Sequence, residues 1–338
     1  MDNRYSRQEM FNCIGIEGQR NIRQKHVLIV GVGALGSSSA EMLVRSGVGK
    51  ITLIDRDYVE WSNLQRQQLY CEEDVIDQLP KAIAAKRRLN EINHEVEIDA
   101  YVYEATFENL EPLIKDVDVI VDGTDNFDIR FLLNDISQKY KIPFIFGACV
   151  GSYGSTFTII PDKTACLHCI LEKIPLTGAT CDLVGVISPI VQMIASYQVA
   201  ECLKLLVEDS EALRSTYLAI DLWKNQFVSI NLKKAKNNNC LSCGVVPTFP
   251  FLQYEANMKT TILCGRDTVQ IRPSQHHDIN FDSIEKELKK RGSVKRNPFL
   301  ITCDLSPYRL VLFQDGRALI HGTNDVEQAK SLYYSLLG

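Results

Sequence analysis

A continuous apolar run that turns directly into spaced glycines constrains the fold of this chain more than any other feature. Residues 27–36 read VLIVGVGALG, which is typical of a buried parallel strand followed by a tight turn into a helix whose N-terminus favours a phosphate. A second apolar run, residues 51–54, ends in Asp55, which lies 19 residues after Gly36, where an acidic residue usually binds a ribose hydroxyl. The two runs favour a nucleotide-binding βαβ unit over a βαβ turn without a ligand. Its predicted ligand-binding residues are Gly31, Gly33, Ala34, Gly36 and Asp55.

Further runs rich in β-branched residues extend the predicted sheet. Residues 117–121 read as another parallel strand, and residues 144–147 and 155–160 as later, possibly antiparallel, strands of the same sheet. A helix begins at Ser188-Pro189 and runs to Leu206, and its many apolar positions predict burial against the sheet or a second subunit. We therefore predict an α/β fold with a Rossmann-like, doubly wound, mostly parallel sheet that is extended by antiparallel strands.

The chain is longer than one average domain, and its 338 residues divide near position 250. Three asparagines at 237–239 and prolines at 247 and 250 mark the boundary. We predict one domain over residues 1–248 and a small α+β module over residues 249–338, whose role the sequence does not indicate. The module should contain strands at 260–264, 269–272, 299–303 and 309–313, and helices at 281–291 and 326–337.

Charge and hydropathy exclude several classes of partner. A net charge of −5 gives no general attraction to nucleic acid or to anionic lipid. The sequence shows no signal-like leader and no apolar stretch long enough to span a membrane, so we expect a cytoplasmic protein. Eleven cysteines in such a chain favour reduced thiols or metal ligands over a disulfide framework.

Positive charge follows the predicted nucleotide unit. Arg66, within the segment Asn63–Gln67, and Lys81 are cations that a nicotinamide-dependent oxidoreductase does not need beside its cofactor. Cations in this position neutralise the charge that develops when a phosphoryl bond is attacked and pyrophosphate leaves. The alternative interpretation is that each cation forms an ordinary surface ion pair.

A polar cluster follows the predicted strand at 117–121. Asp125 lies just beyond the carboxyl end of that strand, where open α/β sheets bind ligands, and Arg130 follows. A carboxylate there would hold Mg²⁺ against a triphosphate. The alternative is that Asp125 or Asn126 caps the next helix.

Two CxxC pairs predict a metal site. Cys166, Cys169, Cys240 and Cys243 supply four thiolates, enough for a closed tetrahedral Zn²⁺ site of structural role. A pair of redox dithiols is the alternative, although neither CxxC opens a thioredoxin-like βαβ unit. A further thiol, Cys181, lies in a loop rich in glycine and threonine. It is either a thiol that reaches a partner or an inert loop cysteine.

Together these motifs resemble the bacterial adenylyltransferases of sulfur-carrier proteins, the MoeB and ThiF group, which is related to the ubiquitin-activating enzymes. The resemblance covers roughly residues 1–246. It rests on the following segments: RYSRQ at 4–8, the glycine loop, DRD at 55–57, NLQRQ at 63–67, PK at 80–81, TDN at 124–126 with Arg130, and both CxxC pairs.

The resemblance implies that ATP and Mg²⁺ are bound and that the C-terminal glycine of a small ubiquitin-like carrier is adenylated. It implies nucleotide binding by the glycine loop and Asp55, phosphate binding by Arg66 and Lys81, and a magnesium site at Asp125 supported by Asn126 and Arg130. Asp57, Asn63 and Gln65 belong to the same predicted site. Arg7 resembles an arginine that the other subunit of a homodimer supplies.

Three departures from the family pattern stand out: Gly33-Ala34 replaces a Gly-Gly pair, no glycine lies close before Pro80-Lys81, and no rhodanese-like domain is evident. The last predicts a separate sulfurtransferase. We expect a carrier from molybdopterin or thiamine thiazole biosynthesis, and the sequence does not distinguish them. The alternatives are an NAD-dependent oxidoreductase and a non-catalytic nucleotide-binding scaffold.

Overall fold

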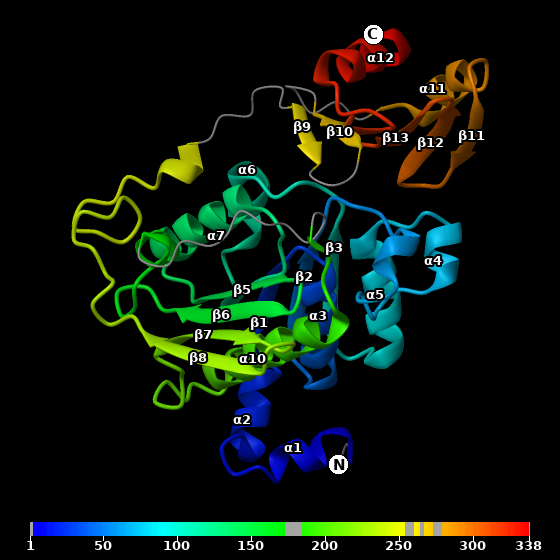
Figure 1. The fold of residues 1–338 in the computed structure, drawn as a ribbon. Helices are drawn as coiled ribbons and strands as arrows, with labels where there is room; N and C mark the ends of the chain where they lie inside the picture. The colour runs from blue at the N-terminus through cyan, green and yellow to red at the C-terminus, as the bar shows by residue number, and fades with distance from the viewer. Residues whose placement is uncertain (1–2, 173–183, 254–259, 264–266, 273–278, 338) are drawn as a thin grey trace. The chain divides into compact units, whose positions relative to one another are not determined.

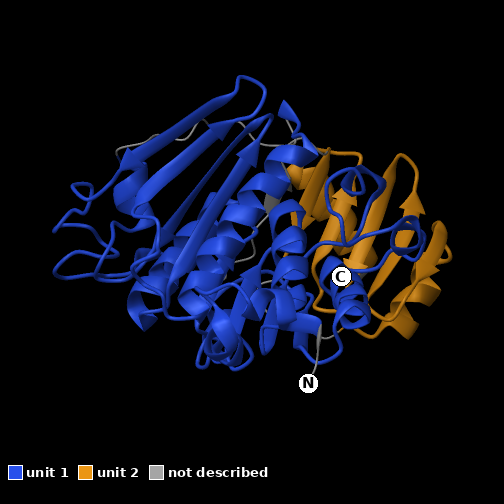
Figure 2. Ribbon diagram, turned by 90° about the horizontal axis from the view of Figure 1, so that it is seen from below, with its two compact units in different colours: residues 1–253 blue, residues 254–338 orange. Residues whose placement is uncertain are grey.

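The computed structural model describes residues 3–172, 184–253, 260–263, 267–272 and 279–337. The chain forms two compact units, residues 1–253 and 254–338 (Figure 2). None of the helices in the described ranges is long and apolar enough to cross a membrane.

The first unit is built on an eight-stranded sheet of order β3-β2-β1-β4-β5-β6-β7-β8 (Figure 1). Strands β1 to β5 are parallel, and β6, β7 and β8 continue the sheet antiparallel. The strands are β1 His26–Val30, β2 Lys50–Ile54, β3 Glu97–Tyr101, β4 Val119–Asp122, β5 Phe144–Val150, β6 Tyr153–Ile159, β7 Thr216–Asp221 and β8 Gln226–Asn231. The predicted fold class is therefore confirmed.

Helices cover both faces of this sheet because alternate residues of each buried strand point to opposite sides. Val27 and Ile29 of β1 pack with α3 (Ala34–Arg45), α5 (Lys81–Ile92) and α10 (Ser188–Leu206), whereas Leu28 and Val30 pack on the side of α7 (Phe127–Tyr140). The predicted helix that begins at Ser188 is thus present and lies against the sheet. The remaining helices that the structure describes in this unit are η1 Asn3–Tyr5, α1 Ser6–Glu9, α2 Gly15–Ile22, η2 Trp61–Asn63, α4 Glu72–Ile76, α6 Phe107–Leu110, η3 Glu111–Leu113, α8 Leu167–Leu171 and η4 Pro250–Gln253.

The pairing of the later strands differs in detail from the sequence prediction. β5 pairs parallel with β4, because α7 provides the crossover between them, and only β6 onward is antiparallel. Three strands were not predicted: β3, β7 and β8. The two edge strands β3 and β8 carry too many polar residues for an apolar run to mark them.

The order of the strands in the sheet changes direction between the neighbouring strands β1 and β4. β2 and β3 are added on one side of β1, and β4 and β5 on the other. The carboxyl ends of β1 and β4 are therefore adjacent at a topological switch point, which is where open α/β sheets bind ligands.

In its described residues, the second unit is a six-stranded antiparallel sheet of order β11-β12-β13-β14-β10-β9 with two helices. Its elements are β9 Thr260–Leu263, β10 Thr268–Ile271, α11 Phe281–Leu288, β11 Ser293–Arg296, β12 Leu300–Leu305, β13 Tyr308–Phe313, β14 Ala318–His321 and α12 Val326–Leu337. It has its own core, which includes Val269, Leu288, Leu310, Ile320 and Ala329. The short strands β11 and β14 were not predicted from the sequence.

Candidate functional site

The glycine loop is held by close backbone contacts at the switch point. Gly31 adopts a φ of +83°, and its carbonyl oxygen would lie 1.8 Å from a Cβ atom at Gly36 and 2.1 Å from one at Gly123. A side chain at Gly36 or Gly123 would therefore displace the backbone of the loop. These glycines allow the loop after β1 to pack directly on the loop after β4.

Gly33 differs from its neighbours because it faces open space. A Cβ atom at Gly33 would meet no heavy atom closer than Nε2 of Gln67, at 3.9 Å. Gly33 is also the N-cap of α3 and provides no side-chain cap. The first-turn N–H groups of a helix have no intrahelical partners and favour an anion. The loop therefore leaves room for a phosphate beside the start of α3.

Asp55 links the end of β2 to the glycine loop. One carboxylate oxygen accepts the Val32 N–H at 2.6 Å, and the other accepts the Asp57 N–H at 2.7 Å. Burial raises the pKa of the Asp55 carboxyl, while the positive charge of Lys81 acts in the opposite direction. Asp55 thus orients the loop as well as lying where a ribose is expected.

Lys81 is a buried cation in this site. Its side chain is 5% exposed, and its Nζ atom lies 3.3 Å from Oδ2 of Asp57. Tyr70 supports the arrangement, because its hydroxyl donates to the Val32 carbonyl at 2.6 Å and lies 3.2 Å from the Lys81 carbonyl. Two segments far apart in sequence, the glycine loop and the start of α5, are thereby held together by one side chain that the sequence analysis did not identify.

The segment Asn63–Gln67 contributes residues of two kinds. Asn63 is fully buried and accepts the Glu60 N–H at 3.0 Å, so it holds the turn together. Arg66 is partly exposed and donates to the Ser62 carbonyl, and Gln65 is exposed, with its Nε2 atom 3.5 Å from the Val186 carbonyl. Gln67 is buried beside Gly33, and its Oε1 atom has no hydrogen-bond partner.

The end of β4 is held by a buried ion pair. Nε of Arg130 lies 3.0 Å from Oδ2 of Asp122, and its NH2 group donates to the carbonyls of Thr124 and Gly147. Burial raises the pKa of the Asp122 carboxyl, while Arg130 and the Thr124 hydroxyl and amide favour the carboxylate. These donors of Arg130 are occupied by protein acceptors. The sequence analysis missed Asp122, although the spacing of a strand-end aspartate and an arginine in the following helix is a usable signal.

The other two predicted residues of this segment behave differently from each other. Asn126 is the N-cap of α7 and accepts the Asp128 N–H at 2.7 Å, which is the capping role that the sequence left as an alternative. Asp125 is exposed at the same edge of the sheet. Asp122 is buried in its ion pair with Arg130, whereas Asp125 is exposed. Of these two aspartates, Asp125 is therefore the one whose carboxylate a ligand can reach.

Arg56 brings a further cation to this edge. Its guanidinium lies 2.8 Å from Glu104, and both side chains are 19% exposed. Burial lowers the pKa of Arg56, but attraction to Glu104, Asp57 and Asp125 more than offsets this effect. Carboxylates from three different loops therefore surround Arg56, a clustering that sequence distance conceals.

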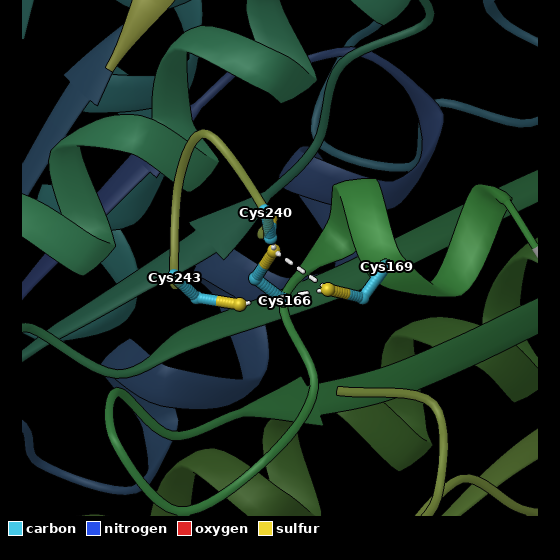
Figure 3. Close-up of side chains that lie close together, drawn as sticks. All are labelled: Cys166, Cys169, Cys240 and Cys243. Atoms are coloured by element: carbon cyan, nitrogen blue, oxygen red, sulfur yellow. Dashed lines mark hydrogen bonds between the residues drawn. The ribbon is translucent and has the colours of Figure 1, made fainter. Parts of the chain in front are cut away.

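The four cysteines of the two CxxC pairs converge on one point (Figure 3). Their Sγ atoms all lie within 4.8 Å of one another, with separations of 3.8 Å for Cys166 to Cys169 and 3.5 Å for Cys166 to Cys240 and for Cys169 to Cys243. Tetrahedral Zn²⁺ with Zn–S bonds of about 2.3 Å requires S–S separations of roughly 3.8 Å. The donor set and its spacing therefore fit Zn²⁺, whereas every measured separation is too long for a disulfide.

Hydrogen bonds around the cysteine cluster support the same interpretation. The Asn237 N–H donates to Sγ of Cys169, and the Ser242 N–H to Sγ of Cys240. Asp135 on α7 accepts the Ser242 hydroxyl and the Phe251 N–H, so it attaches the second CxxC loop to the body of the unit. Such outer contacts orient metal ligands.

Two predicted site residues are not part of this arrangement. Arg7 is exposed, and the N-terminal segment that carries it lies at the opposite end of the strands from the glycine loop. The segment is held there because the neighbouring Gln8 donates to the carbonyl of Ser46. Ser46 is the C-cap of the 12-residue α3, so the two ends of that helix are roughly 18 Å apart. Arg7 therefore does not reach the glycine loop of its own chain. Cys181 lies outside the residues that the structure describes.

Comparisons with a family model and with known proteins all indicate the same family. Residues 5–242 match the model of the ThiF family. The chain is 50% identical to the Sulfur carrier protein ThiS adenylyltransferase of Bacillus subtilis (strain 168) over 339 aligned residues, which cover all of both proteins. It is 34% identical to the Sulfur carrier protein adenylyltransferase of Thermus thermophilus over 75% of this chain and 95% of that protein. The match to the Bacillus protein includes the second unit, which lies beyond the family match.

Solved structures show the same fold. The crystal structure of Escherichia coli MccB bound to MccA-N7isoASN has a TM-score of 0.63 and 23% sequence identity. The match covers 72% of this chain and 76% of that one. At this level of identity the likeness concerns the fold alone.

Proposed function

The chain belongs to the ThiF family, and from this premise we propose that it uses ATP to adenylate the C-terminal glycine of a small ubiquitin-like sulfur-carrier protein. The relatives are named adenylyltransferases, one of them at 50% identity over the whole chain, so they favour this function over an oxidoreductase or a non-catalytic scaffold. The structural observation that carries the proposal is the buried Lys81 beside Asp57, next to a glycine loop with space for a phosphate.

The reaction joins two substrates at the α-phosphorus of ATP. A carboxylate oxygen of the carrier's terminal glycine attacks that phosphorus, the bond to the bridging oxygen breaks, and pyrophosphate leaves with the electron pair. The product is the carrier acyl-adenylate. The barrier is lowered mainly by positioning and by neutralising the charge on the phosphates.

The residues of the site have different tasks in this reaction. The α3 N-terminus and the glycine loop bind phosphate oxygens through N–H groups, and Asp55 fixes the loop and binds the ribose. Lys81 and Arg66 stabilise the charge on the departing pyrophosphate. Asp125 would hold Mg²⁺, which when bound neutralises phosphate charge. The buried Asp122–Arg130 pair keeps the β4 end rigid.

The cysteine cluster would hold one structural Zn²⁺. Its four thiolates fill a tetrahedral site and leave no position for a substrate. The metal would join the loop at Cys166–Cys169 to the loop at Cys240–Cys243. Because reduced thiolates are needed to bind the metal, we propose a cytoplasmic location for the protein.

The carrier is proposed to be of the ThiS type, which serves thiamine thiazole biosynthesis. The relative that matches along the whole chain is named for that carrier, whereas a MoaD-like carrier of molybdopterin biosynthesis is the competing substrate. A separate sulfurtransferase would then deliver sulfur to the adenylate. ATP–pyrophosphate exchange with each type of carrier tests the choice: exchange that depends on the ThiS-type carrier supports it, and exchange that responds only to the MoaD type refutes it.

The enzyme is further proposed to be a homodimer in which Arg7 acts in the partner's site. The support is that Arg7 is exposed and lies at the far end of α3 from the glycine loop of its own chain. Mixing an Arg7→Ala protein with a Lys81→Ala protein tests this arrangement, because random dimers restore one intact site in about four. Recovery of about a quarter of the wild-type activity is expected, and no recovery after subunit exchange would refute the arrangement.

A further inference from the structure

Three glutamines lie close together in the segment after Asn63, and their carboxamides differ in what they contact. Gln65 and Gln68 are exposed, and Gln68 donates to a carboxylate oxygen of Glu41 at 3.2 Å. Gln67, in contrast, is only 3% exposed. Its Oε1 atom is buried and has no hydrogen-bond partner among the residues that the structure describes. Gln67 therefore differs from its two neighbours in carrying a buried polar group that the described part of the chain does not satisfy.

The buried oxygen of Gln67 does not stabilise the fold. A buried acceptor without a donor costs free energy, and an apolar side chain of the same shape at such a position is as stable or more stable. Buried polar groups without partners are few in native structures, so each of them calls for an explanation. Packing alone therefore gives no reason for a glutamine here, and the reason has to come from the other end of the carboxamide.

The amide nitrogen of Gln67 borders the open space beside the glycine loop. A Cβ atom at Gly33 would have Nε2 of Gln67 as its nearest heavy atom from the rest of the chain, at 3.9 Å. Nε2 donates no hydrogen bond to the described residues, and unlike Oε1 it is not fully buried. The two N–H bonds of the carboxamide are thus available to a group that enters the space where the loop leaves room for a phosphate.

Backbone hydrogen bonds hold Gln67 at this position. Its N–H donates to the Asn63 carbonyl at 3.0 Å, and its carbonyl accepts the Tyr70 N–H at 3.1 Å. The Tyr70 hydroxyl in turn donates to the Val32 carbonyl of the glycine loop at 2.6 Å. The turn that carries Gln67 is thereby attached to the loop, so the buried carboxamide would lose little conformational freedom when a ligand binds.

The groups around this space favour a ligand that accepts hydrogen bonds and carries negative charge. The first-turn N–H groups of α3 have no intrahelical partners, and Lys81 brings a buried cation to the same site. The Asp55 carboxylate already accepts the N–H groups of Val32 and Asp57. Because the oxygens of ionised phosphates only accept hydrogen bonds, a phosphate suits this set of donors.

We propose that Gln67 is a phosphate-binding residue of the nucleotide site, and that its Nε2 atom donates to a non-bridging phosphate oxygen of ATP. The proposal rests on the proposed function and adds a neutral donor to the cations Arg66 and Lys81. The amide nitrogen, and not the amide oxygen, is the end that meets the phosphate, because the phosphate oxygen is an acceptor. A neutral donor at this point orients one phosphate without changing the net charge of the site.

Titration calorimetry of MgATP binding to Gln67→Met enzyme, without the carrier, tests the proposal. Methionine keeps the length of the side chain and removes both the donor and the unsatisfied acceptor, so the Tm should not fall. The Kd of MgATP should rise roughly tenfold or more, whereas the Kd of adenosine, which has no phosphate, should stay within twofold of wild type. Gln67→Glu, which places a negative charge beside the phosphates, should bind MgATP more weakly still. Gln68→Met is the matched control, because this neighbouring glutamine is exposed.

The outcomes separate a phosphate contact from a structural role. A Kd for MgATP within twofold of wild type in Gln67→Met or in Gln67→Glu overturns the proposal, while the adenylation function stands. A joint loss of Tm and of adenosine affinity in Gln67→Met would show that the residue supports the fold, and an equal loss of MgATP affinity in Gln68→Met would show that the effect is not specific; either result overturns the proposal. If the wild-type enzyme itself binds no MgATP, the proposed function fails and this proposal fails with it.

Discussion

Two glycines of the loop should respond to the same substitution in opposite ways. A methyl group at Gly36 would lie 1.8 Å from the Gly31 carbonyl oxygen and 3.3 Å from Ile29, so α3 would have to move away from β1. A methyl group at Gly33 meets no heavy atom within 3.8 Å. Gly36→Ala should therefore damage the fold, whereas Gly33→Ala should damage only phosphate binding.

The magnitudes follow from these contacts. Overpacking at Gly36 should cost about 3 kcal/mol, which corresponds to a fall in Tm of roughly 6–12 °C for a domain of this size. Gly33→Ala should change the Tm by no more than about 3 °C. Loss of one charge-assisted hydrogen bond to phosphate, about 1.5–3 kcal/mol, should raise the KM for ATP roughly tenfold to a hundredfold.

Thermal unfolding and ATP-dependent pyrophosphate exchange are measured on both variants. The wild-type protein and Ile76→Ala, which changes an exposed residue on α4, are the references. A Gly33→Ala enzyme with a wild-type KM for ATP would show that the phosphates do not lie on this loop. A Gly36→Ala protein with a wild-type Tm would contradict the packing argument.

Three further predictions concern the metal, the buried ion pair and pH. Removal of the metal by a strong chelator, or a Cys240→Ser substitution, should abolish about one equivalent of bound zinc and lower the Tm; an unchanged Tm after complete removal of zinc would contradict the structural role. Arg130→Met should destabilise the fold by about 3–5 kcal/mol because it leaves Asp122 buried and unpaired, and adding Asp122→Asn should restore part of that loss in chemical denaturation; no recovery in the double variant would count against the pair. Burial, assisted by Lys50, lowers the pKa of His26 below its usual 6.5, so the unfolded chain binds a proton more readily than the native one. Stability should thus fall as the pH drops below about 6.5 until His26 is also protonated in the native state; a His26→Gln protein with the same acid dependence of Tm would refute this assignment.

Local patterns in the sequence predicted those parts of the site whose geometry is local. Gly31 and Gly36 are required by a turn of a few residues, and Asp55 follows its own strand directly. The cysteine pairs were predicted as one site because two thiolates at CxxC spacing have few uses other than chelation. In each case the signal lies within one short segment, although the cysteine site needs two such segments brought together by the fold.

The remaining features depend on tertiary contacts. Arg56 lies among carboxylates from three loops, and Tyr70 links the glycine loop to α5; both arrangements require the completed sheet. The unpaired N–H groups at the start of α7 select Asn126 as a helix cap, although the same residue type also serves as a ligand. Strand β8 was missed because its exposed position relaxes the apolar pattern.

The Arg7 prediction concerns a second chain. The family resemblance predicts that Arg7 acts in the site of the other subunit of a homodimer. In the structure, Arg7 lies near the end of α3 that is far from the glycine loop of its own chain. This position is compatible with the prediction, which the oligomeric state and the mixing experiment have yet to test.

The central claim is tested most directly by the mass of the carrier itself. Wild-type enzyme is incubated with MgATP and a ThiS-type carrier, and the carrier is examined by intact mass spectrometry, with a carrier lacking its terminal glycine and Lys81→Ala enzyme as controls. The carrier should gain the mass of one adenylyl group in the complete reaction and in neither control. A carrier of unchanged mass, in the presence of enzyme that binds ATP, would contradict the proposed function.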